Sequence, residues 1–126
     1  MVKFLAVGLG GALGSIGRYS ISLAAARLSP GDLPLGTLSV NLLGCLLIGL
    51  LWGLFERIHI SHEFRLFLFA GFLGGFTTFS TFGRETVQFF KAGQMLPGLT
   101  YLIVSNGAGL LLVGAGFWLA QHWLKG

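Results

Sequence analysis

Four stretches of this chain contain no Asp, Glu, Lys or Arg, and they limit what it can fold into. They cover residues 4–17, 33–55, 66–83 and 92–124. A helix needs about 20 predominantly apolar residues to cross the hydrocarbon core of a bilayer. The first stretch reaches that length only if its helix continues past Arg18. We therefore predict an all-α membrane protein with four transmembrane helices, at about residues 4–26, 35–57, 64–90 and 96–123.

The composition supports a membrane protein with no second domain. Of the 126 residues, 54% are hydrophobic and 10% are charged, whereas soluble domains carry about 25% charged residues. We treat residues 1–126 as a single transmembrane domain. The eight Lys and Arg residues are scattered singly, which argues against a nucleic-acid-binding surface. No combination of serine, histidine and acid lies at membrane depth, so we predict that the protein is not an enzyme.

The third hydrophobic stretch contains an unusual run, GFLGGFTTFSTF, at residues 71–82. A continuous helix has no need of two adjacent glycines, Gly74 and Gly75, beside several hydroxyl side chains. Glycine permits unusual backbone conformations, and irregular backbone at membrane depth is tolerated only where it is enclosed or lines a polar cavity. We predict that the third helix is broken near Gly74–Thr78 and that the break belongs to an ion-conducting path.

Polar side chains in the other three spans also need partners. Asn41 lies midway along the second span, where an unsatisfied amide is costly. Its amide either joins two helices or donates to a passing anion. Arg18 has no acid within one helical turn, so we expect it to reach the interface or a wet vestibule. Tyr101 and Ser105 are spaced i, i+4 and place two hydroxyls on one face, although Ser105 could instead bond the carbonyl four residues before it.

Two aromatic residues follow the glycines of the third span. Phe79 and Phe82 are three residues apart, so they share a helix face, with Ser80 and Thr81 between them. Such pairs usually pack in a core. The positive edge of a phenyl ring can also line an anion path without fixed charge, and conduction requires binding weak enough to release the ion.

The basic residues are divided almost evenly between the two ends of the predicted helices. Four spans place one group on the same membrane face, namely Lys3, Arg57, Arg65 and Lys125. The opposite face has Arg27, Arg84 and Lys91. This is little bias under the positive-inside rule, so the chain can insert in both orientations. Two oppositely oriented copies can then pair, and we predict an antiparallel, dual-topology homodimer.

Several of these features occur together in one known family. The chain resembles the Fluc (CrcB) family of fluoride channels in the run GGFTTFSTF at 74–82, the run GTLSVNLLG at 36–44, an arginine late in the first span, and Glu85 three residues after Phe82. The resemblance covers essentially the whole chain. It implies a fluoride-selective channel that passively exports cytoplasmic fluoride through two pores per dimer. It also implies a location in the cell (inner) membrane of a prokaryote.

The resemblance further implies roles for individual residues. The pore would be lined by Asn41, Phe79, Ser80, Thr81, Phe82, Tyr101 and Ser105, and the two phenyl rings would turn their edges to fluoride. Arg18 matches a vestibule arginine that lowers the cost of bringing in an anion. A structural sodium ion would be held at the dimer interface by the main-chain carbonyls of Gly74 and Thr77.

The chain departs from the family pattern at three positions, and two other functions stay open. Relatives often carry a serine and a threonine where this chain has Gly109 and Val113, and Gly83 replaces a frequent serine. A one-residue shift of the fourth helix would put Asn106 in the place of Ser105. One rival function is a small multidrug-type exporter, which needs a membrane-embedded acid to exchange protons. The other is an assembly subunit whose glycines serve packing alone.

Overall fold

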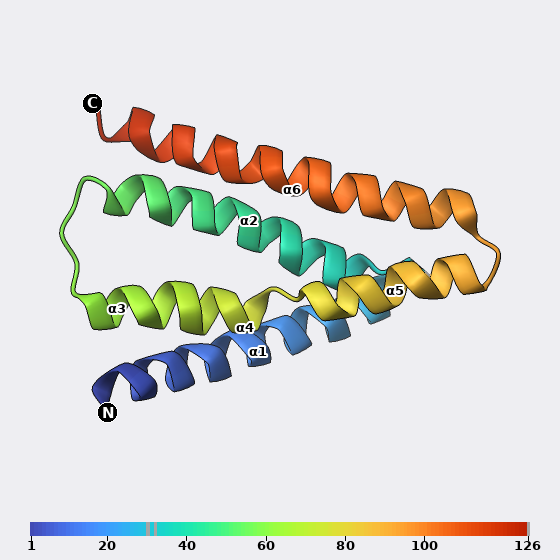
Figure 1. The fold of residues 1–126 in the computed structure, drawn as a ribbon, viewed down its shortest axis with the longest axis horizontal. Helices are drawn as coiled ribbons and strands as arrows, with labels where there is room; N and C mark the ends of the chain where they lie inside the picture. The colour runs from blue at the N-terminus through green and yellow to red at the C-terminus, as the bar shows by residue number, and fades with distance from the viewer. Residues whose placement is uncertain (30, 32, 126) are drawn as a thin grey trace.

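The structure, a computed structural model, describes residues 1–29, 31 and 33–125, and most of them are helical. Three spans are uninterrupted helices: α1 (Val2–Leu28), α2 (Leu35–Phe55) and α6 (Met95–Trp123) (Figure 1). The third span, His62–Lys91, consists of α3 (His62–Leu66), a π-helix η1 (Phe67–Leu73), α4 (Gly74–Phe76) and α5 (Phe79–Lys91). Within the described ranges, these four segments are long and apolar enough to cross a membrane. The prediction of an all-α, four-span membrane protein is confirmed.

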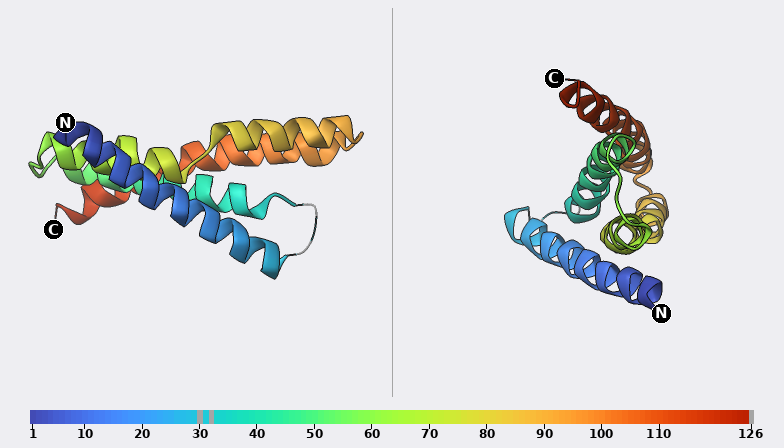
Figure 2. Two further views of the ribbon diagram at one scale, coloured as in Figure 1. Left: turned by 90° about the horizontal axis from the view of Figure 1, so that it is seen from below. Right: turned by 90° about the vertical axis from the view of Figure 1, so that its left-hand side faces the viewer.

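The four spans run side by side along the long axis of the molecule. Both chain termini and the loop between α2 and α3 lie at the same end (Figure 1). α2 packs chiefly against α6, and α1 packs chiefly against η1 and α4. α1 and α6 lie at opposite edges of the molecule (Figure 2). The middle of the third span is therefore close to both α1 and α2.

Glycines allow α1 to lie against the third span at backbone distance. A Cβ atom on Gly14 would overlap the carbonyl oxygen of Phe72, and a Cβ atom on Gly75 would lie 2.6 Å from the carbonyl oxygen of Gly11. Small residues at such positions let membrane helices approach closely. Gly75 thus serves the packing of two helices.

The third span is broken at Thr77 and Thr78, just beyond the glycine pair. Their backbones are extended, with φ/ψ of −90°/157° and −148°/117°. Gly74 is helical, at −62°/−36°. Threonine suits this position because its branched side chain favours extended backbone, and because Oγ1 of Thr78 caps α5 by accepting from the N–H of Thr81 at 3.3 Å. The break lies in the predicted region, but the threonines form it and the glycines do not.

Candidate functional site

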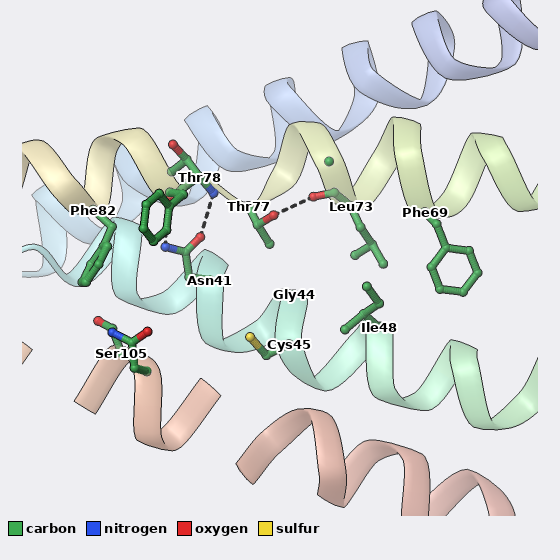
Figure 3. A pocket seen from close by; sticks show the side chains of 13 residues that line it. Asn41, Gly44, Cys45, Ile48, Phe69, Leu73, Thr77, Thr78, Phe82 and Ser105 are labelled. Carbon is green, nitrogen blue, oxygen red and sulfur yellow. Dashed lines mark hydrogen bonds between the residues drawn. The ribbon is translucent and has the colours of Figure 1, made fainter. Parts of the chain in front are cut away.

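A cavity of about 380 Å³ opens between α2, α6 and the broken third span (Figure 3). Its polar lining comes from Asn41, Thr77, Thr78, Ser105 and Asn106. Its apolar lining includes Cys45, Ile48, Phe69, Leu73, Phe79 and Phe82. Among the described residues that line this cavity, none carries a charged side chain. A largely apolar wall with a few convergent polar groups is typical of a site for a small ligand.

Asn41 holds the break by hydrogen bonds in both directions (Figure 3). Its Nδ2 donates to the carbonyl oxygen of Thr78 at 3.0 Å, and its Oδ1 accepts from the N–H of Thr78 at 2.8 Å. These backbone groups have no helical partners at the break, and hydrocarbon offers them none. A primary amide carries two N–H bonds, and the second N–H of Asn41 has no acceptor in the described part of the chain. Asn41 therefore joins two spans and still presents a donor to the cavity.

The break also frees main-chain carbonyl groups. The carbonyl of Gly75 accepts from Nε of Arg18 at 3.1 Å, and the carbonyl of Leu73 accepts from both the N–H and Oγ1 of Thr77. No donor from the described residues reaches the carbonyl oxygens of Gly74 and Thr77. Because the C-terminal end of a helix carries partial negative charge, these oxygens favour a cation. Arg18 reaches the break itself, and its vestibule role stays a prediction.

Phe79 and Phe82 lie close together but in different surroundings. Their ring centroids are 5.7 Å apart. Phe82 is only 8% exposed and packs on Tyr101, with centroids 5.2 Å apart. Phe79 is 80% exposed. One side of the shared aromatic face therefore has no cover within a single chain.

The wall formed by α6 is polar over a short length. Ser105 lines the cavity, and no hydrogen bond to the Tyr101 carbonyl forms within the described residues. The hydroxyl of Tyr101 is buried and has no partner in the described part of the chain. One turn beyond Ser105, a Cβ atom on Gly109 would lie 3.2 Å from Sγ of Cys45. The polar lining that α6 gives to the cavity thus ends at Asn106.

Three of the predicted pore residues, Ser80, Thr81 and Tyr101, lie outside this cavity, and their pore roles stay predictions. Thr81 belongs to the cap of α5, where its Oγ1 accepts from Oγ1 of Thr78 at 3.1 Å, and Ser80 is exposed.

One contact could not be predicted from the sequence: Oγ1 of Thr37 donates to Oε1 of Glu85 at 2.5 Å. The two residues are distant in the chain, and only the packing of α2 on α5 brings them together.

Similarity to known proteins assigns the chain to a family. The family described as CrcB-like protein, Camphor Resistance (CrcB), matches residues 5–117. The chain belongs to the CrcB-like family. A relative from Desulfotalea psychrophila, named fluoride-specific ion channel FluC, is 53% identical over 124 residues, which cover 98% of this chain and 96% of the relative.

Other CrcB-like relatives carry the same name. The protein of Phocaeicola vulgatus is 43% identical over 121 residues, covering 96% of this chain and 100% of the relative. That of Salinibacter ruber is 43% identical over 126 residues, covering 100% and 95%. The resemblance inferred from the sequence motifs is confirmed along nearly the full length of the chain.

Proposed function

We propose that this multi-pass membrane protein is a fluoride-selective ion channel. The observation that carries the proposal is the uncharged cavity at the break of the third span, where the amide of Asn41 and the ring of Phe82 face one space. The cavity lies among segments long and apolar enough to cross a bilayer, which supports a role in transport across it. Relatives that match nearly the whole chain are named fluoride-specific ion channels, which supports the same function.

The chemistry of the cavity suits a small, strongly hydrated anion. Fluoride leaves water only if hard hydrogen-bond donors replace its hydration shell, and N–H and O–H groups are such donors. The positive edge of a phenyl ring adds attraction without a fixed charge, so the ion is not trapped. We assign the pore to Asn41, Phe79, Phe82 and Ser105 of the cavity and to Tyr101, whose ring packs on Phe82 and whose hydroxyl is buried.

Efflux from liposomes containing the purified protein tests the function. We expect rapid release of fluoride and little release of chloride.

Replacement Phe82→Ile should lower fluoride efflux about two- to tenfold, because aromatic contacts are worth roughly 0.5–1.5 kcal/mol and about 1.4 kcal/mol is a factor of ten. Phe89→Ile is the matched control, since Phe89 belongs to the same buried cluster but not to this cavity. Equal fluoride and chloride efflux in the wild type would refute selectivity, and unchanged efflux in Phe82→Ile would refute the ring-edge mechanism.

The channel is proposed to be an antiparallel homodimer with two pores. The 80% exposure of Phe79, at the open side of the cavity, supports a second copy that covers the ring. The even division of basic residues between the two helix ends permits both orientations. Placed in the inner membrane of a prokaryote, such a channel would let cytoplasmic fluoride leave passively down its gradient and so lower fluoride toxicity.

The position of the C-terminus tests the dimer. An epitope tag fused there should be cleaved by external protease in about half of the copies in sealed vesicles, since the charge bias is small. The same tag on a membrane protein of fixed orientation controls for leaky vesicles. Complete cleavage or complete protection would exclude the antiparallel pair.

A structural sodium ion is proposed at the centre of this dimer, bound by the main-chain carbonyls of Gly74 and Thr77. Both oxygens lack a donor among the described residues, and carbonyl oxygens are ligands suited to hard cations. A two-fold axis would bring two copies of each oxygen together. A cation between them would offset the repulsion of four aligned carbonyl dipoles.

Purification with and without sodium tests this site. A ligand present at about 100 times its dissociation constant stabilises the folded state by about 2.7 kcal/mol. Protein purified throughout in N-methyl-D-glucamine should therefore unfold at a lower temperature and conduct less fluoride than protein purified in sodium. Restoring sodium should reverse both effects. Identical unfolding temperatures and fluoride fluxes in the two preparations would refute the proposed sodium site.

A further inference from the structure

Asn106 is an unexpected residue on the membrane-spanning part of α6. It is exposed in the single chain, although an amide facing lipid tails would lack partners. It also lines the cavity at the break, as its neighbour Ser105 does. The few polar groups of the cavity thus give this side chain neighbours that lipid tails would not.

The orientation of the Asn106 amide is fixed by its one hydrogen bond. Nδ2 donates to the carbonyl oxygen of Leu102 at 2.8 Å. A carbonyl oxygen can only accept, so the nitrogen and not the oxygen of the amide must lie on this side. One N–H is thereby occupied, and the second N–H has no acceptor among the described residues. The amide is held in place and has a donor to spare.

Apart from Ser105 and Asn106, α6 supplies no polar side chain to this cavity among the described residues. Gly109 has no side chain and lies against Cys45, whose Sγ would be 3.2 Å from a Cβ added there. The apolar lining of the cavity includes Leu73 and Phe69 of η1 and Ile48 of α2, none of which can donate a hydrogen bond from its side chain. Asn41 offers one spare N–H from α2. The spare N–H of Asn106 belongs to α6, so it adds a donor to another wall of the same cavity.

We propose that Asn106 is a further specificity-determining residue, which donates its spare N–H to fluoride in the cavity that Asn41 also lines. This inference rests on the proposed channel function. A second amide donor replaces part of the hydration shell that a small anion loses. The same hydrogen bond stabilises a larger halide less, because the larger ion is more weakly hydrated and forms weaker hydrogen bonds. Asn106 therefore raises fluoride flux relative to chloride flux. Asn106 is the last polar residue of α6 that lines the cavity, and Gly109, about one turn later, has no side chain to line it.

Liposome flux of three variants tests the role of Asn106. Asn106→Leu, which has similar volume and no donor, should lower fluoride flux by about tenfold to a hundredfold, as expected for the loss of one hydrogen bond to an ion. Chloride flux should stay unchanged, so the fluoride-to-chloride ratio should fall by the same factor. Asn106→Ser, which keeps a donor, should retain most of the fluoride flux. Thr100→Val is the control, because Thr100 is an exposed polar residue of α6 that does not line the cavity.

The outcomes separate this proposal from the channel function and from a structural role. If wild-type protein conducts fluoride selectively and Asn106→Leu does so equally well, Asn106 is not a specificity residue while the channel function stands. If wild-type protein conducts no fluoride, the channel function fails first. Chain association measured in detergent identifies a packing role. A loss of association in Asn106→Leu that matches the loss of flux would overturn the assignment of Asn106 to the pore.

Discussion

The structure depends on how the polar backbone of a broken helix is satisfied inside a bilayer. Hydrocarbon supplies no hydrogen-bond partners, so each N–H and C=O freed by the break needs a partner in the protein or must face a polar cavity. Asn41 of the neighbouring helix α2 provides partners for two of these groups, because its amide accepts a hydrogen bond from the N–H of Thr78 and donates one to the carbonyl of Thr78. Arg18 bonds the carbonyl of Gly75 from the other side. The break is therefore a defined element, held from α2 and from α1.

The same constraint connects the fold to conduction. The amide that holds the break keeps one N–H for the cavity, and the phenyl ring of Phe82 lines the same space beside it. Arg18 does not line the cavity, and its Nε donates to the carbonyl of Gly75. An anion in the cavity thus meets neutral donors in place of fixed charges. Neutral groups bind a hydrated ion less tightly, and this allows it to leave.

The spans were predictable from the sequence because hydrophobicity alone determines which segments cross a membrane. The break was predictable in region but not in cause. Glycine suggested a backbone distortion, whereas Gly75 in fact permits close approach of α1 and the extended residues are Thr77 and Thr78. The need of Asn41 for a partner followed from its position midway along an apolar span. Its partner at Thr78 did not, because the contact depends on how α2 packs against the third span, as does the contact of Thr37 with Glu85.

Solid-state NMR tests most directly whether a neutral amide at the break meets fluoride. The protein, carrying Asn106→Ser so that Asn41 is its one asparagine, would be labelled with ¹⁵N at the asparagine side chain, reconstituted in bilayers with sodium fluoride, and studied by ¹⁹F–¹⁵N dipolar coupling. We expect a coupling between fluoride and Nδ2 of Asn41 that corresponds to about 3 Å, a hydrogen-bond distance. Fluoride coupled to arginine guanidinium nitrogens in a companion arginine-labelled sample, with none coupled to Asn41, would contradict conduction by neutral donors.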